Sequence, residues 1–312
     1  MNDIKSLLGK KNMKSVVKLK PAYKTYIWGG EYFKNIKNIN EDIVAECWEL
    51  STRDIDSSII VSGEHEGQRL DKVITNEDIG PISKEVPYFP LLIKLIDAKD
   101  DLSVQVHPSD EYALKKYQSF GKNEMWHIIS ADPGCGLYVG FNKDYTKEEI
   151  KEKLEQGEIL DTLNFFPVKP GDTFMIKAGT IHAIGQGVRL IEIQQNSDLT
   201  FRLYDYLRKD KNGNYRPLHI QEGLEVINYQ KYEKEDNKSS ILADNKYFHV
   251  ERKEFDGELE IKANKKSFVS FTFLDGEGLV DDIPYRIYDT FFLPFGKKCT
   301  IKGKGIVIIS SL

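Results

Sequence analysis

Four short stretches with the character of β-strands follow one another between residues 174 and 205, separated only by turns. They span residues 174–176, 180–184, 188–195 and 199–205. A chain built largely of such strands favours an antiparallel barrel or jelly roll over a parallel sheet. We therefore expect a mainly β fold with a few helices.

Three segments are expected to be helical because each combines a helix start signal with a helical pattern. Residues 109–114 form a short helix capped by Ser109. Residues 146–154 form an amphipathic helix that Thr146 or Asp144 caps and Gly157 ends. Residues 219–229 form the third.

The distribution of charge and turns predicts the domain organisation. Residues 1–15 read as a loose lead-in and residues 16–230 as a first domain with helical insertions. Residues 231–240 are charged, have little to bury and are expected to form a linker. Residues 241–312 are expected to form a smaller β-domain with no metal site, because the histidine there, His249, has no partner of ligand type.

Composition excludes several classes of partner. The 312 residues are 40% hydrophobic and 30% charged, with a net charge of −5, which argues against a nucleic-acid surface. An anionic substrate would need a local basic pocket. We expect no membrane partner, because no segment reaches the roughly 20 apolar residues that span a bilayer. Three separated cysteines (Cys47, Cys135 and Cys299) indicate a reducing compartment and exclude a cysteine-based zinc site. The expected location is the cytoplasm, with no obligate protein partner.

The stretch 102–108 alternates in the way that a strand with one buried face requires. Leu102, Val104 and Val106 point to one face, where they can anchor the strand in a core. Gln105 and His107 point to the other face and place an amide oxygen and an imidazole side by side. Two such groups, two residues apart, can share one metal ion.

Two further strands supply side chains of metal-ligand type. Glu124 opens one strand, and His182 lies in another after a turn. With Gln105 and His107, they make a shell of two imidazoles, one amide oxygen and one carboxylate, with a charge of −1. Such a shell suits Zn²⁺, and Fe²⁺, Mn²⁺ or Co²⁺ are chemically admissible. An open position would remain for water or substrate.

The segment 191–202 carries further polar residues on strand faces. Glu192 lies on one strand, and Asp198 and Arg202 share a face of the next stretch. An arginine on an inward-facing strand is costly unless it pairs with a carboxylate or binds an anion. Asp198 could supply that carboxylate.

Four segments together resemble type I mannose-6-phosphate isomerase in its short bacterial form, over most of residues 20–305. They are residues 103–108, the pair Lys122 and Glu124, residues 178–183 and residues 192–202. The resemblance implies a cupin-like jelly-roll barrel with a second, degenerate cupin-like domain. It also implies one Zn²⁺ per chain. The implied ligands are Gln105, His107, Glu124 and His182.

The resemblance also assigns the remaining site residues. It implies an acid–base glutamate at Glu192 and an aspartate–arginine pair at Asp198 and Arg202, with Lys122 beside the metal. This chain departs from longer members with Asn123 in place of proline, Trp126 in place of a second lysine, and one extra residue between His182 and Glu192. Trp126 shares a face with Glu124, so it is expected to line the substrate pocket, the alternative being a tryptophan packed in the core. Asp198 is also expected to contact substrate.

The expected reaction is the interconversion of mannose 6-phosphate and fructose 6-phosphate. A proton moves between C2 and C1 through a cis-enediol, with Glu192 as the base. Arg202, with Lys122, would stabilise the developing oxyanion or steer the anionic substrate. Ring opening could use His107, Lys122 or a water on the metal. The alternatives are a cupin metal-dependent oxygenase, since two histidines and a carboxylate also suit Fe²⁺, and a metal-binding sugar sensor without catalysis.

Overall fold

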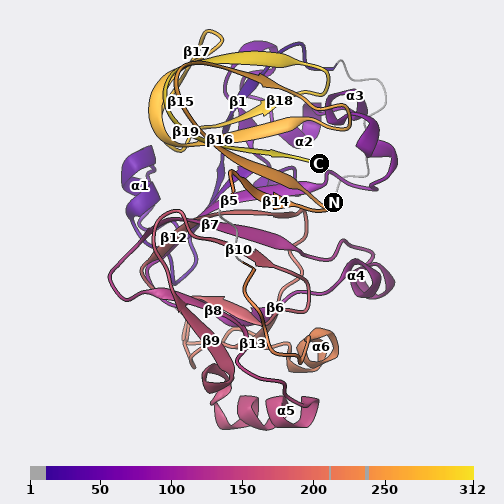
Figure 1. The fold of residues 1–312 in the computed structure, drawn as a ribbon, viewed down its shortest axis with the longest axis vertical. Helices are drawn as coiled ribbons and strands as arrows, with labels where there is room; N and C mark the ends of the chain where they lie inside the picture. Colours follow the sequence, from indigo (N-terminus) through magenta and orange to yellow (C-terminus); the bar gives the residue numbers. More distant parts are fainter. Residues whose placement is uncertain (1–11, 211, 236–238) are drawn as a thin grey trace. The chain divides into compact units, whose positions relative to one another are not determined.

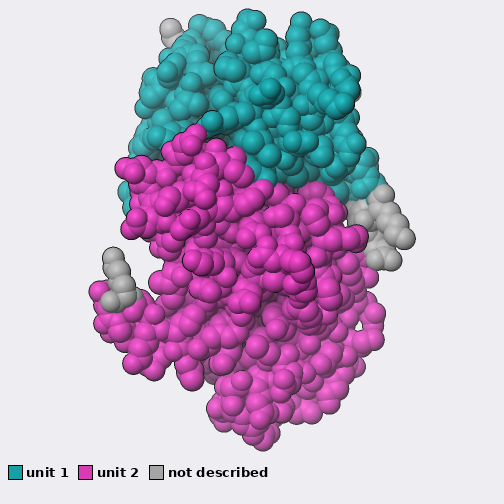
Figure 2. Space-filling view, turned by 90° about the vertical axis from the view of Figure 1, so that its left-hand side faces the viewer, with its two compact units in different colours: residues 1–24, 47–94, 237–312 teal, residues 25–46, 95–236 magenta. Residues whose placement is uncertain are grey.

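The computed structural model describes residues 12–210, 212–235 and 239–312, and its chain separates into two compact units. Unit 1 comprises residues 1–24, 47–94 and 237–312, and unit 2 comprises residues 25–46 and 95–236 (Figure 2). Strands outnumber helices in both units, and neighbouring strands such as β10 with β7 and β15 with β19 pair in antiparallel fashion (Figure 1). The mainly β fold expected from the sequence is therefore confirmed.

Unit 2 holds the segments on which the expected site residues lie. Its helices are α1 (Tyr32–Lys37), α4 (Asp110–Tyr117), α5 (Lys147–Gln156) and α6 (Ile220–Val226), with a 3₁₀ turn at Ile159–Thr162. Its strands are β6 (Val104–Val106), β7 (Glu124–Ala131), β8 (Gly136–Phe141), β9 (Leu163–Pro167), β10 (Thr173–Ile176), β11 (His182–Ile184), β12 (Val188–Gln195) and β13 (Phe201–Tyr204).

Two sheet segments of unit 2 enclose a common core. One contains β10, β7 and β12 in that order, and the other contains β13, β6, β11, β8 and β9. Side chains of both meet in one buried cluster, including Trp126 and Leu190 from the first and Val139 and Ile184 from the second. This arrangement is a sandwich of the kind expected for a jelly roll.

Helices cover the outer face of the second sheet segment. Val104 and Val106 pack there in a cluster with Leu224 of α6 and Ile150 of α5. Because side chains alternate along a strand, Gln105 and His107 point to the opposite, inner face. The face assignment predicted for Val104 to His107 is confirmed, but Leu102, which the alternation also placed with the valines, packs instead in the core between the two sheet segments.

Local sequence explains where α5 begins and ends. Thr146 caps it through a reciprocal pair of hydrogen bonds with Glu149, and Gly157 ends it in the left-handed conformation with φ 74°. The helix expected from Thr146 is thus confirmed, and Thr146 rather than Asp144 is its cap. Helix α6 is shorter than predicted, since Ile227 already has an extended backbone.

Unit 1 is built around one large antiparallel sheet. Its order is β14-β15-β19-β16-β18-β1-β4, with β17 paired to β16. The long strands β15, β19 and β16 lie side by side (Figure 1, orange to yellow). The strands are β1 (Val17–Lys20), β4 (Ile59–Ile60), β14 (Ile241–Asp244), β15 (His249–Lys262), β16 (Val269–Val280), β17 (Ile283–Tyr285), β18 (Thr290–Leu293) and β19 (Lys298–Ser311).

The remaining elements of unit 1 are short. They are β2 (Ala22–Lys24), α2 (Leu70–Val73), α3 (Asn76–Ile79) and 3₁₀ turns at Asp54–Asp56, Gly63–His65 and Pro81–Lys84. Strands β3 (Glu46–Leu50) and β5 (Leu91–Ala98) each contain a point where the chain passes from one unit to the other. No helix among the described residues is long and apolar enough to cross a membrane.

These units differ from the domain boundaries expected from the sequence. The C-terminal segment does not make its sheet alone, because β1 pairs with β18 and places Val17 opposite Phe292. The break at residues 236–237 does fall within the expected linker 231–240, whose residues 236–238 lie outside the described part. Of the expected lead-in, residues 1–11 also lie outside it. Met13 is not loose, since it is buried and donates its N–H to Asp78.

Candidate metal centre and active site

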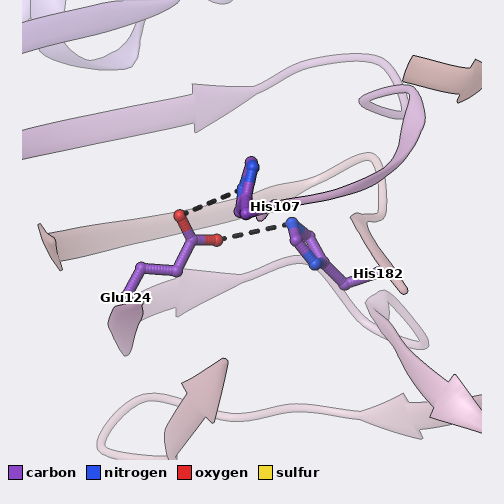
Figure 3. Close-up of side chains that lie close together, drawn as sticks. All are labelled: His107, Glu124 and His182. Atoms are coloured by element: carbon purple, nitrogen blue, oxygen red, sulfur yellow. Dashed lines mark ion pairs between the residues drawn. The ribbon is translucent and has the colours of Figure 1, made fainter. Parts of the chain in front are cut away.

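Three side chains of metal-ligand type converge inside unit 2. His107 follows β6, Glu124 opens β7 and His182 opens β11. The Nε2 atom of His107 lies 3.4 Å from Glu124 Oε2, and Nε2 of His182 lies 3.4 Å from Glu124 Oε1 (Figure 3). All three are buried, and their ligand atoms lie within 4.8 Å of one another. The structure thus brings together three of the four expected ligands.

Backbone carbonyls set the tautomer of both histidines. Nδ1 of His107 lies 3.0 Å from the carbonyl oxygen of Leu199, and Nδ1 of His182 lies 2.8 Å from that of Thr180. A carbonyl can only accept, so each Nδ1 carries the proton and donates it. Each Nε2 therefore presents a lone pair towards Glu124. Metal-binding histidines are commonly oriented in this way.

Gln105 lies beside this group on the neighbouring strand. It is directly opposite His182 in the antiparallel pairing, and its side-chain amide lies 3.3 Å from His182 Nε2. Rotating the amide by half a turn exchanges its nitrogen and oxygen without moving the rest of the side chain. Gln105 can therefore present an oxygen to an ion held by the other three residues.

Burial and local charge set the protonation of these groups. Burial, helped by the positive charge of Lys122, lowers the pKa of His107 to about 4. Burial also lowers the pKa of His182. Burial alone would raise the pKa of Glu124, but the charge of Lys122 and the contacts with His107 hold it well below its usual value. Near neutral pH, two neutral imidazoles face one carboxylate, which is the donor set that a divalent cation requires.

Lys122 lies against the same group. Its side chain is only 4% exposed, and its ammonium is 2.7 Å from Glu124 Oε2 and 3.1 Å from His107 Nε2. A buried carboxylate is costly without a compensating positive charge. Lys122 supplies that charge and lies beside the expected metal ligands.

Glu192 lies on the same inner face as the metal-ligand group. It is directly opposite Trp126 in the pairing of β12 with β7, next to the pair Gln194 and Glu124. The indole Nε1–H of Trp126 donates to Glu192 Oε2 at 2.9 Å, and the Trp126 ring meets the His182 ring edge-on at 5.3 Å. Trp126 is fully buried. The structure shows it holding Glu192, whereas its contact with substrate remains a prediction.

Arg202 lies on β13 directly opposite Gln105. Its Nη1 donates to the carbonyl oxygen of Pro217 at 3.0 Å. Burial, together with the positive charge of Arg216, lowers its pKa, and the carboxylate of Asp205 acts in the opposite direction. Asp198, expected as its partner, is exposed. Asp205 was not among the expected site residues. It lies three residues from both Arg202 and Arg208, and this spacing could have suggested an ion pair.

Comparison with known proteins identifies the family. Residues 16–128 match the family model of the catalytic domain of type I phosphomannose isomerase. The chain is 35% identical over 309 residues to the mannose-6-phosphate isomerase ManA of Bacillus subtilis, covering 94% of this chain and 98% of ManA. This chain belongs to the type I phosphomannose isomerase family. It is also 39% identical over 205 residues to the mannose-6-phosphate isomerase of Streptococcus mutans, over 64% of each chain.

Solved structures agree with this assignment. The crystal structure of mannose 6-phosphate isomerase from Bacillus subtilis matches with a TM-score of 0.84 and 31% identity, over 96% of this chain and all of that one. A structure from Archaeoglobus fulgidus, described as a putative mannosephosphate isomerase, has 24% identity and a TM-score of 0.78, and shows the shared fold alone. The cupin-like fold that the type I family implies is therefore confirmed.

Proposed function

We propose that the protein interconverts mannose 6-phosphate and fructose 6-phosphate, the activity for which its family and relatives are named. The observation that carries the proposal is the convergence of His107, Glu124 and His182 beside Glu192 in a member of this family. A hexose 6-phosphate as the substrate follows from the same family. The cytoplasmic location and the absence of an obligate protein partner stay predictions from the sequence.

The ion that we propose for this site is one Zn²⁺ per chain, held by Gln105, His107, Glu124 and His182. Two imidazoles with a carboxylate and an amide oxygen form a mixed nitrogen and oxygen set that suits Zn²⁺. When bound, a divalent cation polarises substrate oxygens and stabilises negative charge on them. The fit rests on the two Nε2 lone pairs that face the buried carboxylate.

Glu192 is the residue that we assign as the base. The reaction removes the proton from C2 of the open-chain aldose and returns it to C1, which one carboxylate can do from one side of a cis-enediol. The hydrogen bond from Trp126 fixes one carboxylate oxygen at 2.9 Å and leaves the other to take the proton. Burial of both residues excludes water, which would otherwise compete for that proton.

Arg202 and Lys122 supply positive charge near the reacting carbons. Arg202 lies on the strand next to Gln105, and Lys122 contacts Glu124 and His107 directly. Preorganised cations stabilise an oxyanion most where water is excluded. We assign Arg202 and Lys122 to stabilising the negative charge that develops on the substrate. Asp198, which is exposed, is assigned to contact the substrate. Ring opening is assigned to Lys122, because Nδ1 of His107 donates to the carbonyl of Leu199 and its Nε2 is assigned to the ion.

A coupled assay of the purified protein tests this function. Metal content is measured in the same preparation, and both hexose 6-phosphates are supplied as substrates. We expect turnover in both directions from the wild type, and loss of at least about 10³-fold of kcat in Glu192→Gln with its metal retained. A fully metal-loaded protein that converts neither substrate would contradict the proposal.

The same preparation separates the two alternatives, neither of which the family favours. An iron-dependent oxygenase would consume oxygen, which an oxygen electrode detects directly. A non-catalytic sensor would bind mannose 6-phosphate without converting it, and Glu192→Gln would then change nothing but affinity.

A further inference from the structure

Asn123 lies between Lys122 and Glu124 in the sequence, directly before β7. Gln194 is paired with Glu124 across β12 and β7, so its neighbour Gln195 lies on the opposite face of the sheet. Asn123 meets Gln195 there, and both side chains are buried, with exposed fractions of 6% and 5%. The two side chains therefore lie behind the inner face that carries the metal ligands, and neither faces an ion or a substrate bound there.

The side-chain amides of Asn123 and Gln195 form a continuous set of hydrogen bonds. The backbone N–H and Nδ2 of Asn123 both donate to Gln195 Oε1, at 2.9 and 2.7 Å. Nε2 of Gln195 donates to Asp110 Oδ1 at 2.9 Å, and the backbone N–H of Ala178 donates to Asn123 Oδ1 at 3.0 Å. Because a carboxylate only accepts and a backbone N–H only donates, these partners fix the orientation of both amides. We call Asp110, Asn123, Ala178 and Gln195 the amide network.

The amide network joins the four segments that carry the expected histidine and glutamate ligands and the base. Each member is close in sequence to one of these residues: Asp110 to His107, Asn123 to Glu124, Ala178 to His182 and Gln195 to Glu192. The segments come from different strands and loops, so their spacing depends on contacts between them. A metal centre needs its ligands held to within about 0.5 Å, and hydrogen bonds behind the ligands do much of this.

Asn123 makes its contact with Ala178 where the backbone pairing of the sheet stops. The pairing of β10 with β7 ends at Ile176, opposite Glu124, and the chain then continues towards His182. Ala178 lies on this continuing segment, so the Asn123 carboxamide holds the segment beyond the last strand pair. Loss of this bond would let the segment shift relative to Glu124, and the imidazole of His182 would shift with it.

We propose that Asn123 and Gln195 are positioning residues for the metal centre. Their linked amides fix the relative placement of His107, Glu124 and His182, and so set the affinity of the site for a divalent cation. This inference rests on the proposed function, because it takes these residues to bind such an ion. Residues that hold metal ligands from behind commonly contribute 10- to 100-fold to metal affinity. A displaced ligand set would also align the substrate less well with the base.

Metal affinity and the spectrum of bound Co²⁺ test the proposal without any substrate. Asn123→Ala removes the carboxamide, and Gln195→Met keeps the length of the side chain but removes its amide. We expect each change to weaken Zn²⁺ binding about 10- to 100-fold in competition with a chelator. The visible absorption of bound Co²⁺ should also change, because it reports the arrangement of the ligands. The double variant should lose little more than either single variant, since both changes break the same link.

Kinetics at saturating metal separate a positioning role from a purely structural one. We expect kcat of both single variants to fall about 10-fold, while KM for mannose 6-phosphate stays within about twofold because neither side chain faces the substrate. A purely structural role would lower the melting temperature of the metal-free protein and leave metal affinity and the Co²⁺ spectrum unchanged. Gln195→Met changes the side-chain volume little, so it keeps the test informative if Asn123→Ala does not fold.

Asn264→Ala is the matched control. Asn264 belongs to unit 1 and also uses both ends of its amide, since Nδ2 donates to the backbone oxygen of Leu312 at 2.9 Å and Oδ1 accepts from the N–H of Lys266 at 2.7 Å. Its replacement should lower the melting temperature but leave Zn²⁺ affinity and the Co²⁺ spectrum unchanged.

The outcomes for the inference and for the proposed function are distinct. If the Asn123 and Gln195 variants keep the metal affinity and the Co²⁺ spectrum of an active wild type, the positioning role is wrong and the function stands. If the variants lose metal affinity but the wild type isomerises neither sugar phosphate, the function fails and the positioning role stands. A wild type that binds no Zn²⁺ would overturn the positioning role together with the metal centre.

Discussion

Replacing Trp126 by phenylalanine tests whether the indole hydrogen bond positions the base. The change removes the N–H that donates to Glu192 at 2.9 Å in a fully buried place, while keeping an aromatic ring beside His182. A hydrogen bond to a charged group contributes about 1.5–3 kcal/mol. If the hydrogen bond lowers the activation free energy by that amount because it holds Glu192 in its reactive position, its loss should lower kcat about 10- to 150-fold. The smaller ring also leaves a cavity, so stability should fall by about 1–3 kcal/mol.

The measurement is steady-state kinetics with metal content and a thermal melt on the same sample. Thr173→Val is the control, because it removes the hydroxyl within 2.9 Å of His127 Nδ1. Thr173 and His127 lie directly opposite each other, one residue from Phe174 and Trp126 and hence on the other face of the sheet. The Thr173→Val variant should be less stable than the wild type but keep a kcat within about twofold of the wild-type value. A metal-loaded Trp126→Phe variant with a kcat within about threefold of the wild type would refute the positioning role.

Three further changes test other parts of the structure. His182→Ala should abolish stoichiometric metal binding, so that added zinc no longer raises the melting temperature. If metal analysis still finds one equivalent of metal per chain, His182 is not a required ligand. Gly223→Ala should lower the free energy of unfolding by about 1–3 kcal/mol, because the new Cβ would clash with Leu203 Cδ2 and push α6 away from β13. An unchanged midpoint of urea unfolding would contradict this packing. Thr146→Ala should cost about 1 kcal/mol of stability by removing the cap of α5 without changing kcat, and a loss of activity would mean that α5 acts on the site.

Features set by short-range rules could be predicted from the sequence. Alternation along one strand fixed which face carries Gln105 and His107, and the packing of Val104 and Val106 under the helices confirms it. Thr146 and Gly157 predicted α5 because capping depends on a few adjacent residues. The same alternation along β7 places His127 on the face opposite Glu124, and His127 is buried there.

Features that depend on long-range pairing could not be predicted. Nothing in residues 17–20 indicates that they complete the sheet of residues 241–312, because strand partners are chosen by the whole fold. The indole of Trp126 meets Glu192 only because β7 and β12 pair in one register. Arg208 reaches Asp205 because the backbone between them reverses at Tyr206 and Leu207, residues that carry no turn signal of their own.

The central claim is that a metal held by the buried histidines and glutamate is required for isomerisation. It is tested most directly by stripping the protein with a chelator and adding Zn²⁺ back in steps while measuring conversion of mannose 6-phosphate. We predict that the stripped protein is inactive, and that activity rises in proportion to bound metal and levels off at one equivalent per chain. Undiminished turnover by the stripped protein, or full metal binding without turnover, would contradict the account.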